Sequence, residues 1–343
     1  MEFLADYGLF LLKAVTVVIA LLFVIGGIAS MSRRSQRQGG HGEIRVENLN
    51  DAFEDMAERI REEVLPEEIL KREHKARKKA DKEREKSEVE NPRRRVYVLD
   101  FDGDIRASAV DDLRNEITAV LAVAGAKDEV VVRLESGGGL VTSYGFAASQ
   151  LERIRRAGIP LTVCVDEIAA SGGYMMACVA DRVMAAPFAI VGSIGVVAQL
   201  PNFHRLLKKH DIDVELHTAG EYKRTLTVFG ENTDKAREKF REELEDAHVL
   251  FKSFIGQWRP QVDLAAVATG EHWFALRGRD LKLVDELMTS DEYLVNAAKD
   301  SDVFLVHWHH RRTLAERMGF VAEGTLDRVL TRWWGRAVNR RVL

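Results

Sequence analysis

A serine stands within a run of small residues, Ala169-Ala170-Ser171-Gly172-Gly173, where an apolar stretch leads into a predicted helix. Backbone N–H groups at the start of a helix have no partner within the helix and point outward. Acyl transfer uses such groups, because they stabilise the oxyanion of a tetrahedral intermediate. Ser171 is therefore a candidate nucleophile, and the Gly172 amide is a candidate oxyanion donor. The ordinary alternative is that Ser171 is only a helix N-cap, which its spacing alone favours.

A glycine-rich turn, Ser136-Gly137-Gly138-Gly139, follows another predicted strand. Glycine lets the backbone approach a substrate closely, so Gly138 and Gly139 are candidates for the second oxyanion donor. A tight connection from a strand to a helix explains the same residues without any chemistry. A nucleotide site is not indicated, since the sequence has neither a G-x-G-x-x-G pattern nor a Walker lysine here.

A nucleophilic serine requires a base, and Lys223 in the run Glu221-Tyr222-Lys223 is the candidate. A lysine accepts a proton only when it is neutral, which requires a pKa near 7–8 instead of about 10.4 and destabilises the ammonium form by roughly 4 kcal/mol. Apolar neighbours and the positive charge of Arg224 would favour the neutral form. For an arbitrary lysine, an exposed surface charge is the simpler interpretation.

None of the ten histidines belongs to an H-E-x-x-H or similar metal-ligand pattern. A cluster at His307, His309 and His310 has no acidic residue or cysteine nearby, so we expect no metal and no organic cofactor. Four further histidines stay open as members of an alternative triad: His204, His217, His248 and His272.

From residue 96 onward, strand and helix patterns alternate. We expect strands at 96–101, 129–136, 160–166, 182–186, 192–198 and near Val303, and helices at 111–123, 141–156, 233–258 and directly after Ser171. This alternation predicts an α/β domain with a mainly parallel sheet. The three candidate features each follow a predicted strand. Because the reactive crevice of an open α/β sheet lies outside the carboxyl ends of its strands, we expect the three to be neighbours in space.

Residues 7–31 form a nearly uninterrupted apolar segment of the length that crosses a bilayer as a helix. The segment exceeds the apolar region of a signal peptide, so we predict an uncleaved anchor in contact with the lipid bilayer. Residues 33–94 are densely charged, which predicts a helical or flexible stalk. Arg33, Arg34 and Arg37 follow the apolar segment and favour a cytoplasmic location for the rest of the chain.

The bulk composition excludes some classes of protein. A formal net charge of −4 and a pI near 6.2 do not suit a nucleic-acid partner. Only Cys164 and Cys178 occur, each within an apolar stretch, so we expect buried free thiols and no disulfide framework.

Several blocks together resemble the signal peptide peptidase A family, which is peptidase family S49. They are the N-terminal YGLFLLKAVTVV, the charged stalk, AASGGYMMACVAD around Ser171, APFAIVGSIGVVAQ at 186–199 and HTAGEYKRTLT around Lys223. The resemblance covers nearly the whole chain. It implies a crotonase- or ClpP-like superhelix of ββα units, preceded by one transmembrane helix and a stalk. The implied boundaries are 1–32 for the anchor, 33–94 for the stalk, 95–300 for the peptidase domain, and 301–343 for a C-terminal strand and amphipathic helix.

The resemblance also assigns roles to individual residues. It implies that Ser171 is the nucleophile, that Lys223 is the general base, and that Gly172, Gly138 and Gly139 form the oxyanion hole. Relatives assemble into dome-shaped oligomers in which the serine and the lysine can come from adjacent subunits, so we expect a homo-oligomer.

Two further features follow from the same resemblance. The segment Gly192-Ser193-Ile194-Gly195-Val196 is similar to the family strand that lines the substrate groove and pairs with an extended peptide. Gly137 stands where the family commonly has a proline. Glycine loosens a turn that proline would restrict.

The sequence thus predicts a serine endopeptidase, anchored by a single span in the bacterial inner membrane, that hydrolyses peptides or membrane-associated polypeptides through an acyl-enzyme. Relatives act outside the cytoplasm, so the resemblance favours a periplasmic catalytic domain, in conflict with the arginines. One alternative is a non-catalytic, polypeptide-binding membrane scaffold on the same fold. Another is acyl-CoA chemistry, which the shared fold permits but the Ser171 and Lys223 blocks disfavour.

Overall fold

The computed structural model describes Thr16 and residues 42–90 and 93–310. Apart from Thr16, the predicted anchor at residues 7–31 lies outside these ranges, as does the predicted C-terminal helix beyond residue 310. Within the described ranges, no helix combines the length and the hydropathy required to cross a bilayer. Residues 44–307 form one compact unit, which contains all the candidate site residues.

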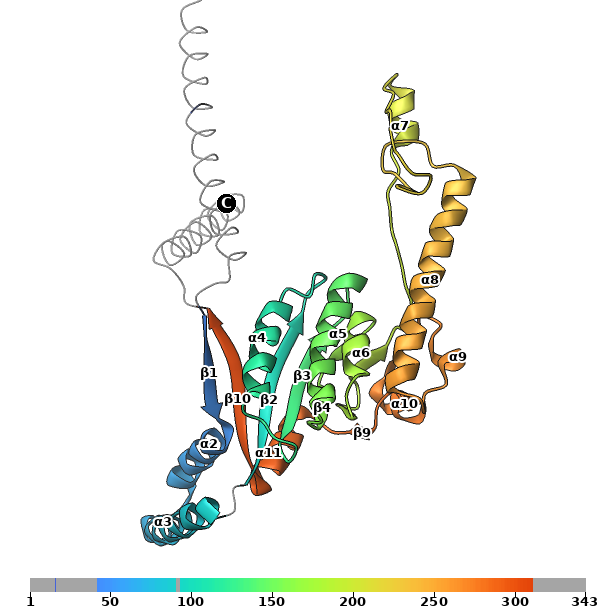
Figure 1. Ribbon diagram of the computed structural model, residues 1–343. Helices are drawn as coiled ribbons and strands as arrows, with labels where there is room; N and C mark the ends of the chain where they lie inside the picture. The colour runs from blue at the N-terminus through green and yellow to red at the C-terminus, as the bar shows by residue number, and fades with distance from the viewer. Residues whose placement is uncertain (1–15, 17–41, 91–92, 311–343) are drawn as a thin grey trace, which may run out of the picture. The chain divides into compact units, whose positions relative to one another are not determined.

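A single, largely parallel sheet organises this unit (Figure 1). Its strands are β1 (Gly42–Asn48), β2 (Arg94–Gly103), β3 (Glu129–Ser136), β4 (Leu161–Val165), β5 (Ile168–Ala170), β6 (Arg182–Ala185), β7 (Ile190–Gly192), β8 (His272–Phe274), β9 (Glu286–Leu287) and β10 (Ser301–His310). The main run has the order β1-β10-β2-β3-β4-β6-β9. A branch leaves β3 through β5, continues to β7, and ends in β8, which pairs with β7 antiparallel.

Helices cover both faces of the sheet. The helices of the described ranges are α2 (Leu49–Val64), α3 (Glu67–Glu90), α4 (Val110–Leu121), α5 (Val141–Arg156), α6 (Gly172–Ala177), α7 (His204–Lys209), α8 (Asp234–Trp258), α9 (Leu264–Val267), α10 (Ala275–Asp280) and α11 (Ser290–Asp300). Figure 1 shows α4, α5 and α6 along one face, where their side chains join the larger core. On the other face, Leu294 of α11 and Phe53 of α2 pack in a second core. The central strands are therefore buried on both sides, which explains their continuous valine-rich runs.

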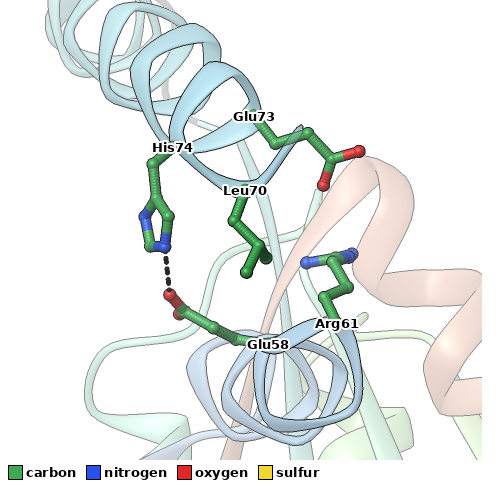
Figure 2. A pocket seen from close by; sticks show the side chains of 5 residues that line it. All are labelled: Glu58, Arg61, Leu70, Glu73 and His74. Atoms are coloured by element: carbon green, nitrogen blue, oxygen red, sulfur yellow. Dashed lines mark ion pairs between the residues drawn. The ribbon is translucent and has the colours of Figure 1, made fainter. Parts of the chain in front are cut away.

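The helices α2 and α3 form a hairpin that continues from β1. Leu65 and Pro66 separate them, and proline has no N–H with which to continue a helix. Figure 2 shows the small hollow between the two helices, where His74 Nε2 lies 3.0 Å from Glu58 Oε1. Its volume of about 10 Å³ is enough for about one water molecule, so we assign no ligand to it. These helices occupy much of the predicted stalk at 33–94, whose boundaries stay a prediction.

A long excursion, residues 193–233, separates β7 from α8, and we call it the arm. Apart from α7, the arm has no helix or strand. Helix α8 begins after Thr233, whose Oγ1 accepts a hydrogen bond from Ala236 N at 3.2 Å. Near its other end, Phe251 and Ile255 pack in the larger core. Figure 1 shows α7 at the end of α8 that lies away from the sheet.

The predicted α/β class with a mainly parallel sheet is confirmed, and the elements expected at 129–136 and 141–156 coincide with β3 and α5. The strand expected at 192–198 is wrong, because β7 already ends at Gly192. Gly192 and Ser193 have φ angles of 96° and 53°, which turn the chain out of the extended conformation. The implied superhelix of ββα units and the domain boundary at residue 300 stay predictions. Across that boundary, β10 pairs with β2 within the same sheet.

Candidate active site

Ser171 stands at a sharp junction between β5 and α6. Its φ of 52° and ψ of −117° lie in a region that residues other than glycine rarely adopt. Ser171 N–H donates to Gly192 O at 2.8 Å, and Ser171 O accepts from Met175 N at 2.9 Å, so the backbone is held on both sides. Although Ser171 holds the N-cap position, its side chain makes no capping hydrogen bond. In α/β-hydrolases, the nucleophilic serine also lies on a strained strand-to-helix turn.

The glycine-rich turn lies directly beside Ser171. Strands β3 and β5 pair with Ser136 opposite Ala169, so the residues that follow the two strands meet. The approach is so close that a Cβ on Gly138 would lie 2.7 Å from Gly172 N and 2.8 Å from Ser171 Cβ. Gly138 also has a φ of 87°, a conformation that favours glycine. The prediction that these two features are neighbours is confirmed.

Three backbone amides at this junction differ in their suitability as oxyanion donors. Gly138 N–H donates to Ser136 Oγ at 3.1 Å and is therefore already engaged. Gly172 provides the first amide of α6, which has no acceptor within the helix. Gly139 follows in the same turn. We therefore narrow the predicted oxyanion donors to the amides of Gly139 and Gly172.

The predicted substrate segment, residues 192–196, begins where β7 ends. Ser193 N–H donates to Glu271 O at 2.7 Å on the side of β8. On the other side, Gly192 O accepts from Ser171 N at 2.8 Å, and the pairing of β5 with β7 ends at Ala170 and Gly192. A peptide strand along this segment would take the edge beyond β5, directly beside Ser171. The assignment of this groove stays a prediction.

Lys223 lies in the arm and not beside Ser171. The expectation that a strand precedes it is wrong, because residues 211–233 have no regular structure. Its exposed side chain lines an open groove of about 460 Å³ together with Phe240 of α8. At about 1.5 Å per residue, Phe240 lies roughly 16 Å along α8 from Phe251, where the helix joins the core (Figure 1). Within one chain, the structure therefore does not bring Lys223 close to Ser171 and the glycine turn.

Other nucleophiles are poorly suited to catalysis. Cys164 and Cys178 are buried and unpaired, as the sequence predicts. Burial raises the pKa of Cys164 to about 12 and also raises the pKa of Cys178, so both thiols stay protonated at neutral pH. Among the residues that the structure describes, no group of three His, Cys, Asp or Glu side chains is placed to hold a metal ion.

Tyr144 near the start of α5 is part of the site although the sequence pattern does not single it out. A Cβ on Gly172 would lie 2.4 Å from its ring, and its hydroxyl lies 2.5 Å from Ser136 Oγ. A lone aromatic residue in the first turns of an amphipathic helix is usually a core residue. The only local signal is its position a few residues after the glycine turn.

Comparison with known proteins identifies the family of the chain. Residues 2–151 match the N-terminal region of peptidase family S49, and residues 153–304 match peptidase family S49 itself. The chain belongs to peptidase family S49. The resemblance stated from the sequence blocks is therefore confirmed, and the chain is a peptidase. The S49 match contains Ser171 and Lys223, whereas the glycine turn lies in the N-terminal match.

Two similar proteins support the same membership. "Probable protease SohB" of Haemophilus influenzae is 47% identical over 342 residues, which cover 97% of this chain and 96% of the relative. "Probable protease SohB" of Buchnera aphidicola subsp. Schlechtendalia chinensis is 45% identical over 86% of this chain and 100% of its own. Among solved structures, a mutant of the "1510-N membrane-bound stomatin-specific protease" with a substrate peptide has a TM-score of 0.41 and 12% identity, covering 68% of this chain and 99% of that chain.

Proposed function

We propose that the chain is a serine endopeptidase with Ser171 as its nucleophile and Lys223 as its general base. The observation that carries the proposal is the strained junction at Ser171, with the glycine turn packed against it. A sparsely populated backbone conformation costs on the order of 1–3 kcal/mol, and such conformations cluster at active sites. The side chain of Ser171 is also left free of a capping role.

The proposed reaction has two steps. The Ser171 hydroxyl attacks the carbonyl carbon of a bound peptide while neutral Lys223 Nζ takes its proton, and the oxyanion forms beside the amides of Gly139 and Gly172. When the intermediate collapses, the C–N bond breaks, the amine leaves with the proton from the lysine, and an acyl-enzyme ester remains. Water, deprotonated by the same lysine, then hydrolyses the ester and regenerates the serine. These steps require neither a metal nor an organic cofactor.

We place the lysine of each site on the arm of a neighbouring chain in a homo-oligomer. Monomeric proteins rarely expose a large continuous apolar surface. The arm exposes six large apolar side chains: Leu200, Phe203, Leu206, Ile212, Val214 and Leu216. A second copy would cover them and exclude water around Lys223. Loss of water favours the neutral amine that the reaction requires.

A serine-directed fluorophosphonate probe tests the nucleophile. We expect the probe to label Ser171 in the full chain, as located by mass spectrometry, and expect Ser171→Ala to abolish both labelling and peptide cleavage. A folded oligomer that takes up no label would instead favour the binding scaffold.

Mixed oligomers test the origin of the lysine. Ser171→Ala and Lys223→Ala chains should each be inactive, whereas Lys208→Ala, on the same arm, should retain activity. If the two groups come from adjacent chains, equal co-expression of the two inactive variants restores about one quarter of the sites. If both groups come from one chain, no complete site forms and the mixture stays inactive.

We also propose that residues 7–31 anchor the chain in the inner membrane with the peptidase domain on the periplasmic side. The support is the length and apolarity of this segment and the location implied by the family. Extraction of membranes with alkaline carbonate should leave the full chain in the pellet and release a chain that lacks residues 1–32. Alkaline phosphatase fused at the C-terminus should be active, and an inactive fusion would place the domain in the cytoplasm.

A further inference from the structure

We propose that Tyr144 and Ser136 are positioning residues that set the oxyanion turn, through a buried relay of hydrogen bonds. This inference rests on the proposed function of Ser171 and adds two residues to the machinery of that site. Neither residue needs to touch the substrate. Their role is to fix which way the peptide groups of the glycine turn face.

The relay runs from the turn into the core. Gly138 N–H donates to Ser136 Oγ at 3.1 Å, and Ser136 Oγ lies 2.5 Å from Tyr144 Oη. Tyr144 Oη donates to Asp104 O at 2.7 Å. Ser136 Oγ also donates to Gly103 O at 3.2 Å, so the single proton of the Ser136 hydroxyl is shared between Gly103 O and the closer Tyr144 Oη. Both side chains are buried, with 2% of Ser136 and none of Tyr144 exposed.

The same segment, residues 103–105, holds the other side of the turn. Leu140 N–H donates to Ile105 O at 2.9 Å. Gly139 packs so closely on this segment that a Cβ would lie 2.1 Å from Ile105 O. The turn is thus tied to the end of β2 at two points, one before and one after Gly139. With the Gly138 amide committed to Ser136, the Gly139 amide is the one left to face a substrate.

Tyr144 also supports the second oxyanion donor. The Tyr144 side chain packs directly against Gly172, since a Cβ added to Gly172 would lie only 2.4–2.8 Å from atoms of Tyr144. The first residue of α6 therefore rests on this side chain. One side chain therefore contacts Gly172 through its ring and directs Gly138 through its hydroxyl and Ser136. This double contact restricts a turn whose glycines are conformationally permissive.

The full chain with Tyr144→Phe tests the relay, because the substitution removes the hydroxyl and keeps the ring under Gly172. Using an internally quenched peptide that the wild-type chain cleaves, we expect kcat to fall about 10- to 100-fold and KM to change less than about twofold, since the turn stabilises the transition state. Ser136→Ala should give a similar loss. The double variant should be no worse than either single variant, since both remove one relay. The inference would be overturned if the double variant lost activity by the product of the two single losses. It would also be overturned if Tyr144→Phe kept kcat within about twofold of wild type.

Tyr174→Phe is a matched control for the removal of a buried hydroxyl. Tyr174 is as buried as Tyr144 and donates to Leu283 O at 3.0 Å, away from the turn. We expect Tyr174→Phe to lower Tm about as much as Tyr144→Phe does, but to leave kcat unchanged. If Tyr144→Phe lowers kcat no more than Tyr174→Phe does, the relay has only a structural role and the inference is wrong.

The pH profile separates positioning from proton transfer. Burial raises the pKa of Tyr144, so its hydroxyl stays protonated through the neutral range. The ratio of wild-type to variant kcat should therefore be constant from about pH 6 to pH 9. A ratio that changes with pH would assign a titrating role instead. An active Ser171→Ala chain would refute the proposed function, whereas an inactive Ser171→Ala chain beside a fully active Tyr144→Phe chain would refute this inference alone.

Discussion

Replacement of Gly138 by alanine should disable the site while leaving most of the fold in place. The added Cβ would lie 2.7 Å from both Ala170 O and Gly172 N, and 2.8 Å from Ser171 Cβ. Two of these three atoms are backbone, which a rotamer change cannot move away. The φ of 87° at Gly138 adds a conformation that alanine rarely adopts.

The size of the effect follows from these contacts. A sparsely populated backbone conformation costs on the order of 1–3 kcal/mol, and overpacking typically costs a further 1–3 kcal/mol. Because the turn is partly exposed, part of this strain is relieved when the turn moves away from Ser171. The movement withdraws an oxyanion donor, and loss of one donor lowers kcat by about 100- to 1000-fold. We therefore expect kcat to fall by about 100- to 1000-fold, and the free energy of unfolding to fall by the part of the strain that the movement does not relieve.

Peptide cleavage and thermal unfolding measured together provide the assay. Gly137→Ala is the matched control one residue earlier, because its Cβ would find only Ile168 Cδ1 at 3.8 Å, an ordinary contact. We expect Gly137→Ala to keep kcat within about twofold and to be neutral or slightly stabilising. A Gly138→Ala chain with wild-type kcat and Tm would refute the packing argument.

Two further predictions concern charged groups that stabilise the fold. Burial alone would raise the pKa of Asp128, but its hydrogen bonds, chiefly from Arg95, hold the pKa below the ordinary value. Asp128→Asn should therefore lower the free energy of unfolding most at neutral pH, where the carboxylate is charged. The difference from wild type should shrink as the pH falls below about 4, because the wild-type carboxylate then becomes protonated. A difference that does not change with pH would contradict this role of the Asp128 charge. Asp285 accepts two hydrogen bonds from Arg259, which is 1% exposed, whereas the Asp285 side chain is 34% exposed. Asp285→Asn should therefore cost about 1–3 kcal/mol, because it removes the counter-ion of a buried guanidinium. Denaturant unfolding measures both changes, and the exposed Glu286→Gln should shift it by less than about 1 kcal/mol.

The sequence pattern was sufficient where local forces decide the structure. Runs such as residues 129–136 are apolar and β-branched, and these properties predict a buried strand whatever the partner is. The small residues around Ser171 and the glycines after Ser136 each follow a predicted strand, which likewise indicated that the two turns are neighbours. Strand pairing then brought the two turns together, as expected from their common place after parallel strands.

The sequence by itself determined the α/β class, the family, and two of the three candidate features of the site. Only the tertiary structure decided that the Gly138 amide is engaged by Ser136, that Tyr144 supports the turn, and that Lys223 lies on the arm. The reason is that these outcomes depend on contacts between distant parts of the chain, such as the bond from Tyr144 to Asp104 across 40 positions. The periodicity and spacing of residues in the sequence indicate which residues are buried and which lie in turns. They do not indicate which distant groups form hydrogen bonds with a buried hydroxyl.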